Sequence, residues 1–351
     1  MSGGVDSAVA ALLLRRAGFD VHGLYMSNWD EDDDYCTSAQ DFQDARASAE
    51  ELAIPLHRVS FAADYRARVF DYFLTEYRAG RTPNPDVLCN REIKFGLCLE
   101  YAARLGARRF ATGHYARIDH TDFGPVLRKA RDAEKDQSYF LHAVDRRHFA
   151  NVLFPLGEFT KAEVRALARE AGLPVYDKPD STGICFIGER PFREFLSRYI
   201  PTSPGDIVDE HGERVGRHRG LAFHTLGQRG GLEIGGRSGA REDAWYVAAK
   251  NLRENQLVVV QGHDHPLLTS RALTTGPCNW LVQRDSIEFD SAIKVRYRQP
   301  DQPCHAVVGD DGAIRVTFAE PQRAVTPGQF AVLYDGDRCL GGGVIEHTTP
   351  Q

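Results

Sequence analysis

Short apolar runs alternate with longer stretches of helical periodicity over the first half of the chain. Strand-like runs that alternate with helices are typical of a parallel α/β sheet. We therefore predict an α/β fold with a parallel sheet for the N-terminal part. The pattern predicts strands at 21–26, 56–61 and 108–112, and helices at 6–17, 39–53, 63–79 and 91–105.

Glycines and a capping pattern mark the ends of these helices. A residue that tolerates positive φ is favoured just after a helix C-terminus. Three of the predicted helices are followed by Gly18, Gly80 and Gly106. Thr160 and Glu163 have the spacing of a capping box, which predicts a further helix at this point.

The pattern changes near residue 200, where glycine-rich turns begin to separate short alternating runs. From 271 onward these runs are joined at Asp-Gly turns, which predicts hairpins and a small antiparallel β-barrel or sandwich. The segment 198–262 is predicted to be a small domain of mixed structure. We expect three domains, at 1–197, 198–262 and 263–351.

Composition is that of a globular protein, with 351 residues of which 42% are hydrophobic. There is no apolar run near 18 residues and no signal-peptide pattern, so we expect a cytoplasmic protein that does not enter a membrane. The seven cysteines are scattered without a CxxC pair, which argues against a disulfide framework or a zinc site. Any special cysteine should be a reactive thiol.

The formal net charge of -6 does not indicate a nucleic-acid-binding protein. Locally, residues 213–229 carry four arginines against one glutamate. The acidic run Asp30 to Asp34 could help to hold Mg²⁺, but five adjacent like charges more often form an exposed loop. Charge alone leaves these alternatives open.

Residues 2–7, Ser-Gly-Gly-Val-Asp-Ser, come directly before an apolar helix. Backbone N–H groups at a helix N-terminus favour an anion, so the loop is suited to phosphate. It matches neither GxxxxGK[ST] nor GxGxxG, and a turn capped by Asp6 or Ser7 would explain a lone Ser-Gly-Gly. The full string SGGVDS resembles the signature of the ATP pyrophosphatase (PP-loop) enzymes. This resemblance implies cleavage of ATP between the α and β phosphates and adenylation of a substrate oxygen.

Two cysteines lie in distinctive settings. Cys89 follows Pro83 and Pro85 in what we predict to be a stiff loop leading into a helix near Arg91, where a thiolate would be favoured. Cys185 lies in a glycine-containing segment. The other five cysteines are interpreted as structural. A PP-loop with two such thiols suggests sulfur transfer, with one thiol carrying a persulfide and the other resolving it as a disulfide.

The sequence resembles the bacterial tRNA-specific 2-thiouridylases, which convert the wobble uridine of certain tRNAs to 2-thiouridine. The resemblance covers nearly the whole chain and implies a PP-loop catalytic domain, which is Rossmann-like and related to the adenine nucleotide alpha hydrolases. It rests on SGGVDS, GLYMSNWDEDD, AGRTPNPDVLCNREIKF, ATGHYAR, KDQSYFL, DSTGICFIGER, FREFL, HTLGQR, KVRYRQ and AVTPGQ.

The resemblance implies a role for each matching residue. Cys89 would be the nucleophile, Cys185 the persulfide carrier, and the two would form a transient disulfide, while Asp86 could act as an acid or base. The ATP site would comprise Ser2, Gly3, Gly4, Val5, Asp6, Ser7, Met26 and Gly113. The tRNA contacts would be Asn84, Pro85, Asp86, His114, Lys135, Asp136, Gln137, Arg296, Tyr297 and Gln329.

The resemblance also implies partners. These are the anticodon arm of tRNA, with the lysine, glutamate and glutamine tRNAs expected, and a protein that donates persulfide sulfur. Mg²⁺ is expected with ATP, through ligands that the sequence does not reveal.

Two other functions are consistent with parts of the sequence. Another PP-loop ligase or amidotransferase would adenylate a small metabolite and would not need either cysteine. A non-catalytic tRNA-binding protein would bind tRNA without forming AMP.

The position of SGGVDS, at residues 2–7, is relevant to the non-catalytic alternative, because the resemblance implies a buried strand before this motif. We expect Met1 to be an internal methionine and the start to lie upstream; a chain without that strand would bind ATP poorly.

Overall fold

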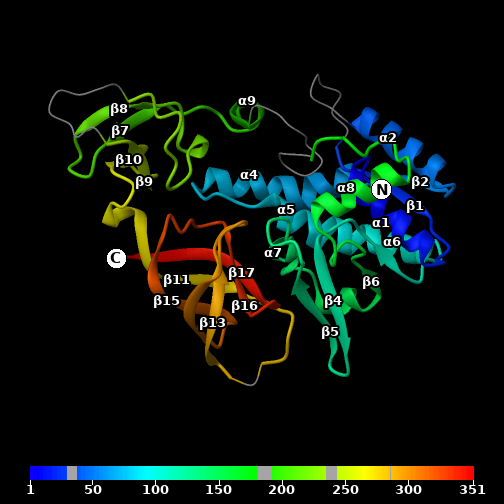
Figure 1. The fold of residues 1–351 in the computed structure, drawn as a ribbon. Helices are drawn as coiled ribbons and strands as arrows, with labels where there is room; N and C mark the ends of the chain where they lie inside the picture. Colours follow the sequence, from blue (N-terminus) through cyan, green and yellow to red (C-terminus); the bar gives the residue numbers. More distant parts are fainter. Residues whose placement is uncertain (30–37, 181–191, 235–242, 285) are drawn as a thin grey trace.

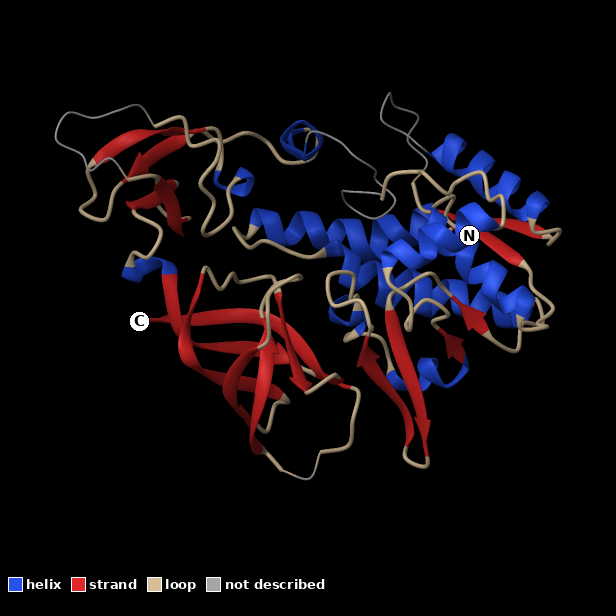
Figure 2. Cartoon of the chain, in the orientation of Figure 1, coloured by secondary structure: helices blue, strands red, loops and turns tan. Residues whose placement is uncertain are grey.

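The computed structural model describes residues 1–29, 38–180, 192–234, 243–284 and 286–351. Figure 1 shows an α/β part at the N-terminal end, a small sheet beyond the end of α4 (Asp71–Arg78), and a β-barrel at the C-terminal end. Figure 2 separates the helix-rich part from the two strand-rich parts. None of the described helices is long and apolar enough to cross a membrane.

Two parallel strand pairs confirm the α/β prediction. β1 (Gly23–Ser27) pairs with β2 (Leu56–Ser60), and β3 (Phe110–Ala111) pairs with β6 (Val152–Leu153). Among the described strands no ladder joins one pair to the other. The amino group of Met1 donates a hydrogen bond to the carbonyl oxygen of Leu24 in β1.

The predicted helices are present, although the helix that carries Cys89 begins earlier than predicted. α1 (Val5–Arg16), α2 (Ser38–Glu51) and α8 (Lys161–Glu170) agree closely with the pattern, and α8 starts at the predicted capping box. The predicted helix 63–79 consists of α3 (Ala62–Tyr65), a π-helical turn (Arg66–Phe70) and α4 (Asp71–Arg78). Gly18, Gly80 and Gly106 have φ of +83°, +74° and +93°, as predicted.

The helix that carries Cys89 starts earlier than predicted. It runs through α5 (Pro85–Leu88), a π-helical stretch (Cys89–Cys98) and α6 (Leu99–Arg104), so the prediction of a loop up to Arg91 is wrong. The reason is local, because the Asn84 side chain caps the Asp86 N–H at 3.2 Å and Pro85 occupies the first helical position. Cys89 therefore lies one turn inside a helix.

The middle part of the chain forms a four-stranded sheet in the order β8-β7-β10-β9. β7 (Gly205–Val208) and β10 (Gln256–Gln261) are parallel, while β8 (Arg214–His218) and β9 (Trp245–Asn251) pair antiparallel at the edges. The prediction of mixed structure here is consistent with this arrangement. Short helical elements lie around it at α9 (Phe192–Ser197), Leu221–Phe223 and Pro266–Leu268.

The C-terminal strands close into a barrel, as the Asp-Gly pattern predicted. The antiparallel order is β11-β15-β14-β13-β16-β17, and β17 pairs back with β11. Gly312 and Gly336 provide the positive φ of two hairpin turns, at +80° and +57°. The strands are β11 (Thr269–Pro277), β13 (Glu288–Lys294), β14 (Gln302–Val308), β15 (Ala313–Arg323), β16 (Phe330–Asp335) and β17 (Arg338–Pro350), with β12 (Asn279–Trp280) paired to β17.

A hairpin that the pattern did not predict joins the N-terminal part to the barrel. β4 (Ala116–Thr121) and β5 (Gly124–Lys129) pair with each other, and Arg128 of β5 is opposite Arg338 of β17. The largest core cluster contains side chains from both parts, so the two share one hydrophobic interior. Near it lie α7 (Ser138–Leu141) and the 3-10 helix Arg146–Asn151.

Candidate active site

Two glycines allow the backbone to pack closely around the N-terminal loop. Gly3 has φ +78°, and a Cβ on it would lie 2.2 Å from the Asp41 carbonyl oxygen on α2. A Cβ on Gly113, just beyond β3, would lie 2.8 Å from the Asp6 carbonyl carbon. Any larger residue would push the loop away from its neighbours. Both positions therefore require glycine because neighbouring backbone packs tightly against them, and we call the loop 2–7 together with Gly113 the glycine cradle.

The loop leaves the start of α1 without a side-chain cap. Gly4 is the N-cap residue and has no side chain to offer. The Ser7 hydroxyl donates to the Gly4 carbonyl at 3.0 Å and accepts from the Ser2 N–H at 3.0 Å. Ser7 thus closes the turn, as the alternative explanation for this loop requires, but no side chain caps the first N–H groups of the helix. The N-terminus of a twelve-residue helix is therefore suited to an anion.

Asp6 is held by a lysine that lies far away in the sequence. Lys161 Nζ donates to the two Asp6 carboxylate oxygens at 2.7 and 2.8 Å, and the Tyr115 hydroxyl donates at 2.8 Å. Lys161 also lies 2.7 Å from Asp180, and its side chain is only 13% exposed. Burial, reinforced by Asp6, raises the pKa of Tyr115 above its usual value. Its hydroxyl therefore remains a donor.

Asp180 is the centre of a cluster of cations. Lys135 lies at 2.6 Å, Lys161 at 2.7 Å and Arg165 at 3.0 Å. Burial alone would raise the pKa of Asp180, but hydrogen bonds from Lys135 and Lys161 outweigh it and lower the pKa to about 2. Lys135, predicted to contact tRNA, is thus paired within the protein.

Lys178 ties the loop to α2. Its ammonium donates to the Gly3 carbonyl at 3.1 Å and to Asp41 at 2.8 Å, and it is also bonded to Asp44. Sequence reasoning missed Lys161, Lys178 and Asp180. One signal for Lys161 was present, because a lysine at the first position of a helix opposes the helix dipole and needs another reason to be there.

Met26 connects the loop region to the core around Cys89. It is partly buried on β1 and packs against the cluster that contains Cys89 and Trp29. Asn28, just beyond β1, is 1% exposed, and neither its amide nitrogen nor its oxygen has a partner among the described residues. A buried amide without partners marks a position where a ligand or water would complete the bonding.

Cys89 is fully buried, with 0% of its surface exposed. The next residue, Asn90, is 2% exposed and donates from Nδ2 to the Phe140 carbonyl at 3.2 Å. Cys98, Cys304 and Cys339 are also buried, in agreement with their interpretation as structural, whereas Cys278 is half-buried. Burial raises the pKa of these four thiols to about 11 or 12, which makes them poor nucleophiles at neutral pH.

The predicted tRNA contacts fall into separate groups. Gln329 in the barrel donates to the Thr82 carbonyl at 2.8 Å, and Arg296 donates to the Ala324 carbonyl. The Tyr297 ring lies 4.4 Å from that of Phe140. These side chains meet other parts of the protein here, and their contact with tRNA stays a prediction.

The other predicted contacts lie near β3 to β5. His114 is 7% exposed, and burial, with nearby Lys94, holds its pKa well below the usual value. Asp136 is buried and accepts from the Ala130 N–H at 3.0 Å. Gln137 accepts from the Tyr115 N–H at 2.9 Å. All three side chains are thus buried or bonded within the protein, and their contact with tRNA stays a prediction.

Several predicted features lie outside the described residues. Cys185, and with it the disulfide to Cys89, cannot be placed, and the same holds for the acidic run Asp30 to Asp34. Within the described ranges no cluster of three or more acidic, histidine or cysteine side chains could hold a metal ion.

Three family models match the chain in order. They are a tRNA methyl transferase HUP domain at 1–189, a tRNA methyl transferase PRC-barrel domain at 193–261 and an aminomethyltransferase β-barrel domain at 270–345. The tRNA-specific 2-thiouridylase MnmA of Alcanivorax borkumensis is 55% identical, over 99% of this chain and 96% of its own length. The corresponding protein of Chromohalobacter salexigens is 56% identical, over 99% of this chain and 91% of its own length. That of Cupriavidus metallidurans is 53% identical, over 99% of this chain and 98% of its own length.

A solved structure, NMN synthetase from Francisella tularensis, is also similar at 24% identity, over 51% of this chain and 63% of its own. Its TM-score of 0.32 is too low to carry an argument.

Proposed function

The chain belongs to the tRNA-specific 2-thiouridylase family, and on that premise we propose that it is an ATP-dependent tRNA-uridine 2-sulfurtransferase. The observation that carries the proposal is that the glycine cradle and Cys89 adjoin one strand. Met1, next to the cradle, is bonded to Leu24 of β1, and Met26 of β1 packs on the cluster that contains Cys89.

The residues present fit a bound ATP. Gly3 and Gly113 let the backbone pack tightly around the loop, and the start of α1 has no side-chain cap, which leaves its N–H groups available to a phosphate. Lys161 and Lys178 place positive charge beside this loop. The unpartnered amide of Asn28 lies beyond the carboxyl end of a parallel strand, where ligands of open α/β sheets bind. Mg²⁺ would accompany the phosphates.

ATP serves to activate the uridine, because the C2 carbonyl oxygen is a poor leaving group. That oxygen attacks the α phosphate and pyrophosphate leaves. The terminal sulfur of a persulfide on Cys185 then bonds to C2, and AMP leaves with the former carbonyl oxygen. The Cys89 thiolate attacks the Cys185 sulfur, so the S–S bond of the persulfide breaks and a Cys89–Cys185 disulfide forms. A thiol reductant restores both cysteines.

The substrate is proposed to be the wobble uridine in the anticodon arm of the lysine, glutamate and glutamine tRNAs, in the cytoplasm. Asn84, Pro85 and Asp86 lie at and just after the start of the helix that carries Cys89, which supports a role for them at the target base. Arg296 and Lys135 suit phosphate contacts and Tyr297 suits stacking. A separate protein would deliver the persulfide sulfur to Cys185.

A single assay tests the proposal. The protein is incubated with tRNA, ATP and a persulfide donor, and the nucleosides are analysed by mass spectrometry. We expect 2-thiouridine, together with AMP and pyrophosphate. AMP formed without tRNA would indicate another adenylating ligase, and tRNA binding without AMP would indicate a non-catalytic protein.

The family models are described as tRNA methyl transferases, so methyl transfer to tRNA is a second candidate. It shares the substrate class but differs in the group transferred. A methylated nucleoside that forms with a methyl donor and without ATP would favour it. The phosphate cradle beside Lys161 favours sulfur transfer instead, because methyl transfer has no need of nucleotide phosphates.

A further inference from the structure

Residues 80–84 connect α4 to the helix that carries Asp86 and Cys89. α4 ends at Arg78, and Gly80 follows it in the left-handed region. The next helix is capped by Asn84. Between them the backbone has no regular structure. The position of this connector therefore decides where the Cys89 helix begins.

The barrel holds the middle of the connector. The Thr82 N–H donates to the Pro327 carbonyl at 3.0 Å, and Gln329 Nε2 donates to the Thr82 carbonyl at 2.8 Å. A Cβ on Gly328, which has φ +93°, would lie 2.9 Å from the Thr82 nitrogen. Both backbone groups of Thr82 are thus bonded to the barrel at close approach.

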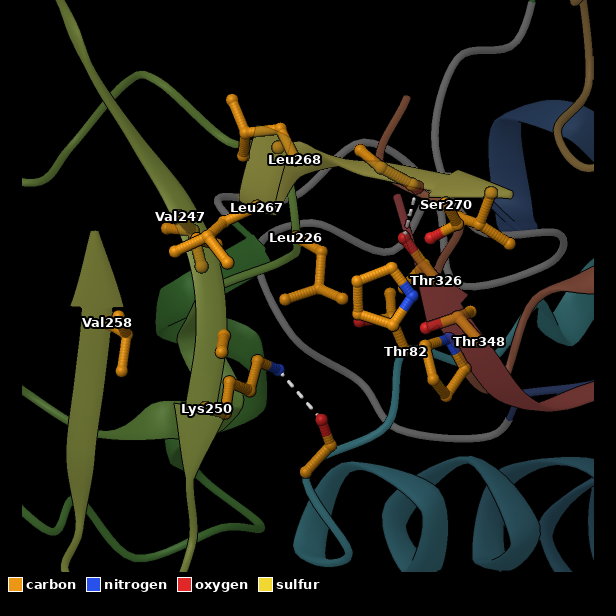
Figure 3. A pocket seen from close by; sticks show the side chains of 18 of the residues that line it. Thr82, Leu226, Val247, Lys250, Val258, Leu267, Leu268, Ser270, Thr326 and Thr348 are labelled. Atoms are coloured by element: carbon orange, nitrogen blue, oxygen red, sulfur yellow. Dashed lines mark hydrogen bonds between the residues drawn. The ribbon is translucent and has the colours of Figure 1, made fainter. Parts of the chain in front are cut away.

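The middle sheet holds the start of the connector through one lysine. Lys250 on β9 donates from Nζ to the Gly80 carbonyl at 3.0 Å, and Figure 3 shows its side chain reaching from the strand to the end of the helix. Carbonyls at a helix C-terminus carry partial negative charge, so they attract an ammonium. A Cβ on Gly80 would lie 2.6 Å from Leu252, so strand and helix end are in close contact.

A cavity of about 380 Å³ lies beside these bonds, where the three parts of the chain meet (Figure 3). Because the space is not filled by side chains, close packing does not fix the connector on this side. Individual hydrogen bonds must therefore hold the connector in place on this side. The wall includes Arg81, Leu226, Val258, Leu268, Val325 and Thr348.

Among the residues that the structure describes, no acidic side chain pairs with the ammonium of Lys250. Within the described part of the chain, Gly80 is its one hydrogen-bond partner, and no carboxylate lies within ion-pair distance. Burial lowers the pKa of Lys250 to about 8. Lys250 is half-buried, and a desolvated cation without a charged partner opposes folding. The charge itself is therefore not expected to add to stability.

We propose that Lys250 is a positioning residue for the thiolation reaction, which acts through Gly80 and the connector on Asp86 and Cys89. The inference rests on the proposed function, because the step it serves is sulfur transfer to tRNA. The middle sheet, through Gly80, and the barrel, through Thr82, then set the geometry of the nucleophile together.

The test is Lys250→Met in the full-length protein, which keeps the apolar stem and removes the ammonium. Steady-state formation of 2-thiouridine is measured against ATP and tRNA, together with the melting temperature. We expect kcat to fall about 10- to 100-fold, since a misplacement of about 1 Å remote from the chemistry can cost about 100-fold. KM for ATP should stay within about twofold. The melting temperature should not fall.

Two further variants serve as controls. Lys250→Arg retains a donor and should recover most of kcat. Arg253→Met removes a cation from an exposed position nearby on the chain and should behave as the wild type.

A kcat for Lys250→Met equal to that of the wild type would overturn the inference. So would a lower melting temperature with a kcat that recovers when the assay is cooled, because the role would then be structural. If the wild-type protein makes no 2-thiouridine, the proposed function itself is refuted. The comparison of Lys250→Met with the wild type tests only the role of Lys250.

Discussion

The phosphate loop and the Cys89 segment are held in place by different forces. Charged side chains surround the loop, with Lys161 between Asp6 and Asp180 and Lys178 on the Gly3 carbonyl. Cys89 is buried in an apolar cluster instead, and the connector before it is held by hydrogen bonds to its own backbone N–H and C=O groups. One region is built from exchangeable ion pairs, and the other from packing and fixed hydrogen bonds.

This difference suits the two tasks. A triphosphate that enters the loop can take over contacts with Lys161 and Lys178, because partly exposed ion pairs are exchanged at little net cost. A thiolate that must reach one sulfur atom needs a fixed geometry, which packing provides. The comparison therefore predicts that changes in the two regions affect different kinetic constants.

The largest effect is expected at Cys89. Cys89→Ser should reduce 2-thiouridine formation by about 1000-fold or more, on the scale of other nucleophile deletions. ATP binding, measured by calorimetry, should change little because the loop is untouched. Cys185→Ser should behave in the same way. Full activity in either variant would refute the sulfur-transfer mechanism, and Cys98→Ser, at a buried site with a raised thiol pKa, is the matched control.

The next largest effect is expected at Lys161. Lys161→Met should lower kcat/KM for ATP by about 100-fold, because a charged group that stabilises the transferring phosphoryl group is removed. Lys161→Arg should retain part of the activity. Arg169→Met, on an exposed side of the same helix, should have no effect. If Lys161→Met and Arg169→Met lower kcat/KM for ATP equally, Lys161 does not have a special role at the loop.

A smaller effect is expected on stability at Asp180. Its pKa is lowered to about 2 in the folded protein, so the stabilisation is present above the unfolded value near 4 and is lost as the pH falls through about 2. Asp180→Asn should lower the free energy of unfolding at pH 7 by about 1 kcal/mol, a value reduced because the carboxylate is partly exposed. The difference between variant and wild type should shrink between about pH 4 and pH 2. Denaturant titration at several pH values measures it, and a difference that is independent of pH would contradict the ion-pair account.

The smallest effect is expected at the capping box of α8. Thr160 Oγ1 accepts from the Glu163 N–H at 3.3 Å, and the Thr160 N–H donates to Glu163 at 2.7 Å. Thr160→Ala should lower the free energy of unfolding by about 0.5 kcal/mol, and Thr160→Ser by less. KM for ATP should rise slightly, because Lys161 is the first residue of this helix. An unchanged KM would show that α8 does not need its cap to place Lys161.

Local features of the fold could be predicted from the sequence because they depend on neighbours along the chain. Gly80 and Gly106 end helices, and Asp-Gly turns at Gly312 and Gly336 build barrel hairpins. The start of the Cys89 helix was missed because Pro83 and Pro85 were interpreted as one loop. Pro85 is in fact at the first helical position behind Asn84, where proline is favoured.

The site could be predicted only in part. Residues 2–7 are contiguous, so the motif could group Gly3 with its neighbours in the loop. The partners of the loop could not, because Lys161 reaches Asp6 across 155 residues and Lys178 reaches Gly3 across 175. Ion pairs between distant segments leave no periodic signal in the sequence. The same holds for Lys250 and its bond to Gly80.

The central claim is that ATP activates the uridine oxygen and that sulfur then replaces it. It is tested most directly with tRNA that carries ¹⁸O at C2 of the wobble uridine, in a reaction with ATP and a persulfide donor. Mass spectrometry should find one ¹⁸O atom in AMP for each 2-thiouridine formed, because the oxygen leaves with the adenylate. AMP without ¹⁸O, in a reaction that forms 2-thiouridine, would contradict the account.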